Sequence, residues 1–352
     1  MYRRRQEPAG RGGGQDTGLP PWGRAHVMRI LVTGCAGLIG SRVSELLLRE
    51  GHSVIGVDNL NHAYDVRLKE WRLSRLQGEP RYTFHRLDIT VREALSRLFR
   101  EHSLAGVVNL AARAGVRQSL EDPWGYYETN VRGTLNLLEL CRERGVKKLV
   151  LASTSSVYGA QTPRPFREEA KTDSSLSPYA ASKKAAEDLA HTYHHLYDLD
   201  VTVLRYFTVY GPAGRPDMSI FRFIQRIAED RQITVFGDGT QERDFTYIDD
   251  IARGTLAALK PSGYEVINLG SDRPVRLQEV IKLIEGLLGR KAVIEPRPVH
   301  PADVPATWAD ITKARELLKW QPQVPLEDGL KRTVAWYSAN RAWAKEIEVG
   351  TA

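Results

Sequence analysis

Short runs of apolar residues alternate with amphipathic segments along the chain up to residue 207. Each run is short enough for one strand, and the segments between runs have apolar residues at helical spacing, as Val43, Leu46 and Leu47 do. The runs predict strands at residues 30–32, 54–57, 82–87, 106–112, 148–153 and 201–207, and the segments predict helices at 38–50, 65–77, 91–102, 123–145 and 178–197. Strands and helices that alternate in this way form a parallel sheet covered on both faces. The pattern therefore predicts an α/β fold with a doubly wound parallel sheet.

The pattern changes after Gly211. Pro212, Gly214 and Pro216 interrupt the chain, and shorter elements follow. Helices are predicted there near residues 218–230, 249–259, 277–288 and 326–341. We interpret residues 28–210 as the first domain and residues 211–345 as mainly a smaller C-terminal α/β domain that caps a cleft.

The composition is typical of a globular protein. Of 352 residues, 42% are hydrophobic and 26% are charged, close to globular averages. No apolar run reaches the ~18 residues that a membrane span needs, and the N-terminus lacks an apolar signal core, so we expect a cytoplasmic protein with no membrane partner. Cys35 and Cys141 are the only cysteines, which provide neither a disulfide framework nor a metal cluster.

Part of the net charge of +7 arises in residues 1–27, where five arginines and two acidic residues contribute +3. This segment is rich in Gly, Arg and Pro and has no periodic apolar pattern, so we predict a disordered basic tail. No interleaving of the arginines with aromatic residues or lysines supports stacking on bases. An inert extension is therefore favoured over a nucleic-acid-binding arm, and no nucleic-acid partner is expected.

Three glycines follow the first predicted strand. Gly34, Gly37 and Gly40 allow a sharp turn and close approach of a ligand, and the free N–H groups of the next helix attract a pyrophosphate. The second predicted strand ends in Asp58, at a position where an acid suits a ribose 2′-hydroxyl. Because this carboxylate would repel a 2′-phosphate and no Arg immediately follows it, NAD is favoured over NADP.

A candidate catalytic pair lies in the helix predicted at residues 178–197. Tyr179 and Lys183 are spaced i and i+4, which places them on one face of that helix. An ammonium near a phenol, together with the positive nicotinamide ring, favours the phenolate, which can accept a proton from a sugar hydroxyl. The hydroxyl cluster at residues 153–156 ends the fifth strand, where ligands of such sheets bind.

These motifs together resemble the extended short-chain dehydrogenase/reductase family, and within it the sugar-nucleotide 4-epimerases, over about residues 29–341. Residues 58–61, 112–117, 206–211, 214–218 and 303–308 are most similar to the motifs of the UDP-glucuronate 4-epimerases. The resemblance implies a Rossmann-type NAD-binding domain, a UDP-sugar-binding C-terminal domain and a homodimer. It implies conversion of UDP-glucuronate to UDP-galacturonate through a 4-keto intermediate.

The resemblance also implies roles for individual residues. Thr154, Tyr179 and Lys183 are the implied catalytic residues. NAD is implied to contact Gly34, Gly37, Leu38, Ile39, Gly40, Asp58, Asn59, Asn61, Asp88, Ile89, Leu110, Ala111, Ala112, Asn130, Tyr179, Lys183 and Tyr206. The substrate is implied to contact Arg117, Thr154, Ser155, Ser156, Tyr179, Thr208, Arg215, Val235, Phe236, Arg243 and Asp303.

The chain departs from its relatives at two positions, and several alternatives stay open. Arg113 replaces a Gln or His, and His300 replaces an Arg that contacts the diphosphate in several epimerases. The alternatives are a UDP-glucose/UDP-galactose 4-epimerase, a UDP-glucuronate decarboxylase or dehydratase, and a non-catalytic NAD-binding interaction protein. Related decarboxylases carry an acid where this chain has Ser156, and a non-catalytic protein would be expected to lack Tyr179 or Lys183.

Overall fold

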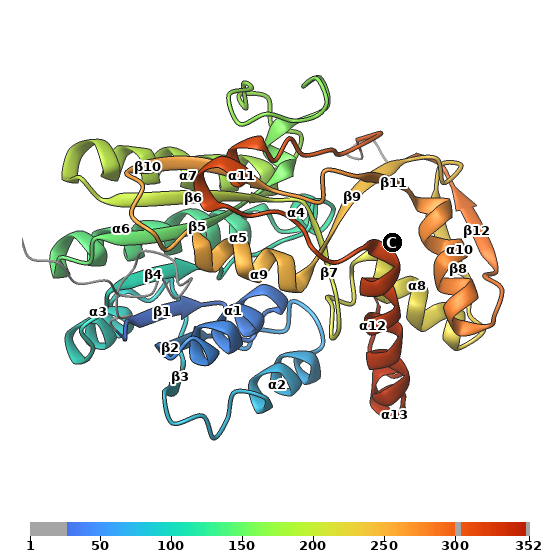
Figure 1. Cartoon of the computed structure of the whole chain (residues 1–352), viewed down its shortest axis with the longest axis horizontal. Helices are drawn as coiled ribbons and strands as arrows, with labels where there is room; N and C mark the ends of the chain where they lie inside the picture. Colours follow the sequence, from blue (N-terminus) through green and yellow to red (C-terminus); the bar gives the residue numbers. More distant parts are fainter. Residues whose placement is uncertain (1–26, 300–303, 350–352) are drawn as a thin grey trace, which may run out of the picture.

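A computed structural model describes residues 27–299 and 304–349. The tail predicted at residues 1–27 thus lies, except for Val27, outside the described residues. Figure 1 shows a broad sheet with helices on both faces, and a second group of shorter elements beside it. The predicted α/β fold with a doubly wound parallel sheet is confirmed.

The central sheet has seven parallel strands in the order β10-β6-β5-β4-β1-β2-β3. Its strands are β1 (Arg29–Thr33), β2 (Ser53–Asp58), β3 (Tyr82–Arg86), β4 (Gly106–Asn109), β5 (Lys148–Thr154), β6 (Asp200–Tyr206) and β10 (Tyr264–Leu269). The six strands predicted from the apolar runs are all present. The strand order reverses between β1 and β4, and ligands of such sheets bind at this switch point.

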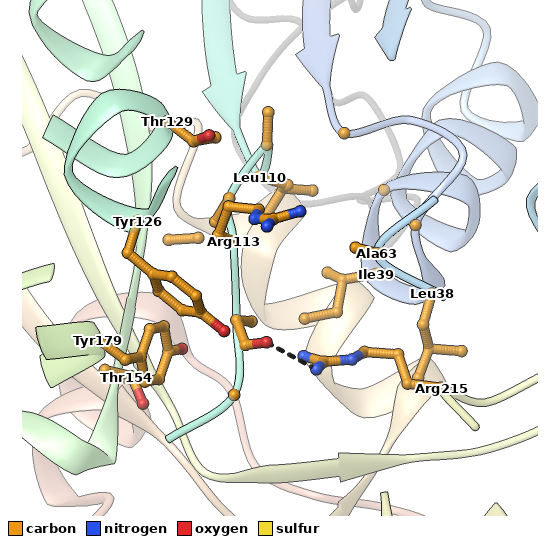
Figure 2. Close-up of a pocket in the computed structure, with 18 of the residues that line it drawn as sticks. Leu38, Ile39, Ala63, Leu110, Arg113, Tyr126, Thr129, Thr154, Tyr179 and Arg215 are labelled. Carbon is orange, nitrogen blue, oxygen red and sulfur yellow. Dashed lines mark hydrogen bonds between the residues drawn. The ribbon is translucent and has the colours of Figure 1, made fainter. Parts of the chain in front are cut away.

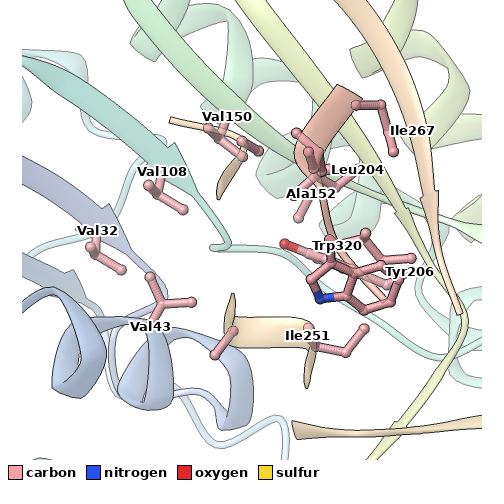
Figure 3. Close-up of a cluster of buried hydrophobic side chains, with 14 of the residues drawn as sticks. Val32, Val43, Val108, Val150, Ala152, Leu204, Tyr206, Ile251, Ile267 and Trp320 are labelled. Atoms are coloured by element: carbon pink, nitrogen blue, oxygen red, sulfur yellow. The ribbon is translucent and has the colours of Figure 1, made fainter. Parts of the chain in front are cut away.

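Alternate residues of each strand pack on opposite faces of the sheet. In β1, Val32 joins one buried cluster and Leu31 joins another. The first cluster, part of which Figure 3 shows, includes Val43 of α1 and Ile251 of α9. Its face is covered by α1 (Leu38–Arg49), α9 (Ile248–Ala257) and α11 (Thr312–Leu318), and the other face by α3 (Arg92–Glu101), α6 (Gly133–Arg144) and α7 (Pro178–Tyr197).

The helix predicted at residues 123–145 is divided. It consists of α5 (Pro123–Tyr127), a π-helical segment (Glu128–Arg132) and α6. Proline at the first position and Gly145 at the end, with φ of +69°, match the ends expected of a helix. A π-helical segment widens the helix locally and is frequent at functional sites, and this one contains the buried Asn130.

The shorter elements form a third buried cluster. A three-stranded sheet has the order β11-β9-β7, and a two-stranded sheet pairs β12 with β8. The strands are β7 (Thr208–Tyr210), β8 (Ile233–Phe236), β9 (Glu242–Tyr247), β11 (Pro274–Arg276) and β12 (Ile294–Arg297). The helices include α2 (Val66–Ser74), α8 (Ser219–Ala228), α10 (Leu277–Leu288), α12 (Leu326–Ala339) and α13 (Arg341–Ala344). The short helix α4 (Gln118–Glu121) precedes α5 and lies outside this cluster.

Residues 211–345 contribute to both groups of elements. The last strand of the central sheet, β10, comes from this range and pairs in parallel with β6, while α9 and α11 cover the sheet beside it. The remaining elements of the range form the smaller group at the right of Figure 1. The chain thus returns to the first group after it has begun the second, and β10 becomes the edge strand of the central sheet beside β6. Within residues 27–299 and 304–349, no helix is long and apolar enough to cross a membrane.

Candidate active site

A cavity of about 620 Å³ lies at the carboxyl ends of the central strands. Its lining comes from the loops after β1, β2, β3, β4, β5 and β6, from the first turns of α7, and from the segment that contains Arg215 and Met218. Figure 2 shows Thr154 and Tyr179 on one side of it and Leu38, Ile39 and Arg215 on the other. The cavity therefore lies between the two groups of elements.

The glycine loop after β1 is packed too closely for side chains. Gly34 has φ of +67°, and a Cβ there would lie 2.7 Å from the backbone nitrogen of Ala111. A Cβ on Gly40 would lie 2.1 Å from the carbonyl oxygen of Gly34. Gly37 caps α1, and no side chain accepts from the first N–H groups of that helix. These donors open on the cavity beside Leu38 and Ile39, which fits a dinucleotide whose pyrophosphate lies at the helix start.

Two aspartates line the same side of the cavity. Asp58, at the end of β2, accepts from the backbone N–H of Ala36 at 3.1 Å and of Leu60 at 2.9 Å. It thereby ties β2 to the glycine loop. Asp88 accepts from Asn59 at 2.7 Å and from the backbone of Thr90 at 2.8 Å. Burial acts to raise the pKa of Asp88, but these hydrogen bonds outweigh it and hold the pKa below its usual value.

Tyr179 and Lys183 follow the start of α7, where Ser177 accepts from the N–H of Ala180. The Lys183 ammonium is buried and donates to the carbonyl oxygen of Ala152 at 2.9 Å. Burial lowers the pKa of Lys183 to about 8, against the opposing charge of Glu187.

Burial also raises the pKa of the Tyr179 phenol, while a hydrogen bond with Thr154 and the charge of Arg215 act to lower it. The sequence predicts that the Lys183 ammonium favours the phenolate. That role of Lys183 stays a prediction, and Arg215 is a further cation that acts to lower the pKa of the phenol. The ring of Tyr126 packs edge-on against Tyr179, with centroids 6.0 Å apart.

A cluster of hydroxyl groups lies at the end of β5, and one of them, that of Thr154, is hydrogen-bonded to Tyr179. Thr154 accepts from the backbone N–H of Ser156 at 3.2 Å, which caps the short helix Ser155–Tyr158. The Ser156 hydroxyl lies 3.2 Å from that of Thr154. Both lie in the cavity lining with Ser155 and Thr208. The arrangement supplies neutral donors close to the phenol of Tyr179.

Arg215 brings a half-buried positive charge to this group. It donates to the carbonyl oxygen of Ala114 at 3.0 Å and pairs with Asp217. Figure 2 marks the bond to Ala114 and shows Arg215 on a different segment from Tyr179. The cavity thus presents a guanidinium, hydroxyls and a phenol to the same space, which suits an acidic sugar.

The structure places most of the predicted site residues in this lining, and their individual roles stay predictions. Those in the lining are Gly34, Gly37, Leu38, Ile39, Gly40, Asp58, Asn59, Asn61, Asp88, Ile89, Leu110, Ala111, Ala112, Thr154, Ser155, Ser156, Tyr179, Lys183, Tyr206, Thr208 and Arg215.

Other predicted residues lie outside the lining. Asn130 is buried and holds the backbone of Arg113 through bonds of 2.8 and 3.0 Å. The guanidinium of Arg117 lies 3.9 Å from the ring centre of Phe236, on β8 next to Val235. Arg243 donates to the carbonyl oxygen of Glu242 at 2.9 Å. Asp303, like His300, lies outside the described residues.

Several lining residues were not predicted. Lys69 is buried and donates to the carbonyl and side-chain oxygens of Asn61 at 2.8 and 2.9 Å. Tyr64, Tyr126 and Asp217 also line the cavity. Asp217 lies in the motif at residues 214–218, which could have marked it, whereas Tyr126 is recognisable only by its contact with Tyr179. Among the described residues, no group of three or more His, Cys, Asp or Glu side chains is placed to hold a metal ion.

Comparisons with known proteins agree with this geometry. Residues 30–270 match the model of the family described as "NAD dependent epimerase/dehydratase family". A UDP-glucuronate 4-epimerase of Thermodesulfobacterium geofontis is 60% identical over 91% of this chain and 99% of its own length. The chain is likewise 42% identical, over 88% of its length and 98% of the relative's, to the CapI protein of Staphylococcus aureus.

Among solved structures, the UDP-glucuronic acid 4-epimerase of Bacillus cereus, in complex with UDP-glucuronic acid and NAD, superposes with a TM-score of 0.84. It is 39% identical, and the match covers 89% of this chain and all of that one. The UDP-glucose 4-epimerase of Thermotoga maritima gives a TM-score of 0.82 at 35% identity, over 89% of this chain and all of its own. The chain therefore belongs to the NAD-dependent epimerase/dehydratase family.

Proposed function

We propose that this enzyme is a UDP-glucuronate 4-epimerase that uses NAD and forms UDP-galacturonate through a 4-keto intermediate. The observation that carries the proposal is the position of Arg215, which lines the same cavity as Tyr179 together with the hydroxyls of Thr208 and Ser156. A guanidinium with neutral donors is suited to a carboxylate, which UDP-glucose lacks. The 60% identity to a UDP-glucuronate 4-epimerase supports the same substrate.

The residues around the glycine loop fit the cofactor. The uncapped N-terminus of α1 would receive the pyrophosphate, Asp58 the ribose, and Asp88 with Ile89 the adenine side. When bound, NAD supplies the acceptor that takes hydride from C4 and returns it to the opposite face. Asp58 retains lone pairs for a ribose hydroxyl, since the structure shows each of its oxygens accepting one backbone bond.

Tyr179 would accept the proton of the 4-hydroxyl and later return it. A hydrogen bond with Thr154 and the charge of Arg215 act to lower the pKa of its phenol, against the burial that raises it, and so favour the phenolate that this step needs. The Lys183 ammonium is held by its hydrogen bond to the carbonyl oxygen of Ala152 in β5.

The 4-keto form of a uronic acid is a β-keto acid, which tends to lose carbon dioxide. Arg215, Thr208 and the serines would hold the carboxylate away from the geometry that breaks the C5–C6 bond. Ser156 adds no negative charge there, unlike the acid that the resemblance places at this position in related decarboxylases. The epimerase is therefore favoured over the decarboxylase.

The substrate is tested by incubating the enzyme separately with UDP-glucuronate and UDP-glucose and resolving the products by NMR. Formation of UDP-galacturonate, with little turnover of UDP-glucose, is expected. Preferential conversion of UDP-glucose, or formation of a UDP-linked pentose and carbon dioxide as the main products, would overturn the proposal.

We further propose that the enzyme is a homodimer. Large apolar side chains are exposed on α4, α5, α6 and α7. They are Leu120, Trp124, Tyr127, Leu135, Leu196 and Tyr197. Trp124 is 81% exposed. Exposure of a large apolar ring among other apolar side chains is unfavourable in water, so a partner surface is expected to cover it. Sedimentation of wild type and of Trp124→Glu tests this: a monomeric wild type, or a variant that stays dimeric, would count against these helices as the interface.

The cytoplasmic location stays a prediction, which fractionation of cells would test.

A further inference from the structure

Arg72 of α2 is the bulkiest of the fully buried side chains in the part of the chain that the structure describes. Its Nη1 donates to the carbonyl oxygen of Ala36 at 3.0 Å and to the hydroxyl of Tyr64 at 2.7 Å. Its Nε donates to the carbonyl oxygen of Ala213 at 3.0 Å, and Nη2 donates to the same oxygen and reaches that of Gly214. The guanidinium is thus surrounded by uncharged acceptors.

The three carbonyl acceptors belong to two segments that lie on the same side of the candidate site, across the cavity from Tyr179. Ala36 lies in the glycine loop, between Gly34 and Gly37. Ala213 and Gly214 directly precede Arg215. Figure 2 shows Arg215 beside Leu38, at the start of the helix that follows the glycine loop. One side chain therefore links the cofactor loop to the segment that presents the guanidinium to the cavity.

A buried charge that meets only uncharged acceptors is costly, so its hydrogen bonds must be well formed. Arginine suits this position because its rigid fork reaches acceptors in several directions at once. A lysine has one nitrogen and cannot span both segments in the same way. Arg72 does not line the cavity itself. Its influence on the reaction would be indirect.

We propose that Arg72 is a positioning residue, which holds the Arg215 segment in register with the glycine loop so that the substrate carboxylate and C4 are aligned with the cofactor. This inference rests on the proposed function. A misplacement of about 1 Å can reduce a rate by roughly 100-fold. Loss of the link should therefore reduce turnover. It should also increase the fraction of the 4-keto intermediate that loses carbon dioxide.

The test compares Arg72→Met and Arg72→Lys with Arg75→Met. Arg75 follows α2 by one position and forms an ion pair with Glu45 at 3.0 Å on the exposed surface, so it is a matched control. Measurements are kcat and KM for UDP-glucuronate, the ratio of 4-keto-pentose to UDP-galacturonate, NAD affinity by calorimetry, and amide exchange over residues 211–217. Thermal melting reports on folding.

For Arg72→Met we expect a fall in kcat of about 10- to 100-fold, a higher proportion of the pentose and faster exchange in residues 211–217. Arg72→Lys should lie between this variant and wild type, and Arg75→Met should match wild type. A folded Arg72→Met with an unchanged product ratio and unchanged exchange would overturn the proposal, even with a lower melting temperature. If neither Arg72 variant folds, Arg72 is needed for folding and the positioning role is overturned.

The outcome is separable from that of the proposed function. If wild type does not epimerise UDP-glucuronate, the substrate assignment fails. Exchange over residues 211–217 and NAD affinity still report whether Arg72 links the two segments.

Discussion

Glu187 and Arg205 form a two-point ion pair inside the protein, behind the catalytic residues proposed here. The distances are 3.0 Å from Nε to Oε1 and 2.8 Å from Nη2 to Oε2. Glu187 also accepts from the hydroxyl of Ser153, and it lies one helical turn after Lys183. The pair therefore connects β5, β6 and α7 directly beneath the cavity.

Removal of Glu187 should destabilise the fold. In Glu187→Ala the Arg205 guanidinium, which is buried, would lose its charged partner, and such losses cost about 3–5 kcal/mol. Urea unfolding measures the change. Glu143→Ala is the control, because its pair with Arg92 is partly exposed and should contribute no more than about 1 kcal/mol. Equal losses in the two variants would contradict the expectation.

Tyr179→Phe should remove the proton acceptor while leaving the fold unchanged. We expect kcat to fall at least ~100-fold, the low end for loss of a general base. NAD affinity and melting temperature serve as controls and should remain near wild type, since the ring still packs against Tyr126. Turnover close to wild type would remove Tyr179 from the mechanism.

The burial of Lys183 predicts how stability depends on pH. Its pKa is about 8 in the folded protein, below the ordinary value of 10.5. Between these values the unfolded chain binds more protons at this residue, so its contribution to the free energy of unfolding should rise from pH 8 to 10.5. The full effect is roughly 3 kcal/mol. Unfolding of wild type and Lys183→Met across this range measures it, and identical slopes would contradict the prediction.

Arg215→Ala should weaken action on the acidic sugar selectively. A charge-assisted hydrogen bond is worth roughly 1.5–3 kcal/mol, so kcat/KM for UDP-glucuronate should fall about 10- to 150-fold. Any activity on UDP-glucose should fall far less. Arg215→Lys keeps the charge without the planar fork and should recover part of the loss. If both sugars are affected equally, Arg215 serves the nucleotide or the fold.

Asp58 should make NAD bind much more tightly than NADP, since the carboxylate accepts from the 2′-hydroxyl and repels a phosphate. Asp58→Asn should weaken NAD binding as well, because Asp58 also holds the N–H of Ala36 in the glycine loop. Calorimetry with both dinucleotides measures this. Equal affinity of wild type for the two would refute the role.

Much of the fold was predictable because it depends on local order. Apolar runs such as Val54–Val57 identify strands, and the spacing of Tyr179 and Lys183 places both on one face of α7. The glycines at 34, 37 and 40 predicted a tight turn at the end of β1. In each case the residues that give the indication lie within a few positions of one another, so the local structure can be predicted from the sequence.

Contacts between distant segments were not predictable in this way. Strand β10 joins the central sheet beside β6 although the smaller group of elements begins between them. The phenol of Tyr179 has a raised pKa because of burial, and the cation that opposes this is Arg215, from another segment.

The parallel sheet, the glycine loop and the local spacing of the candidate catalytic pair follow from the order of residues along the chain. The link from Ala36 through Arg72 to Ala213, and the places of Lys69 and Tyr126 in the cavity lining, depend on how distant segments pack together. Periodicity reports which face of an element is buried. It does not report which distant segment covers that face, and that choice depends on the packing of the whole molecule.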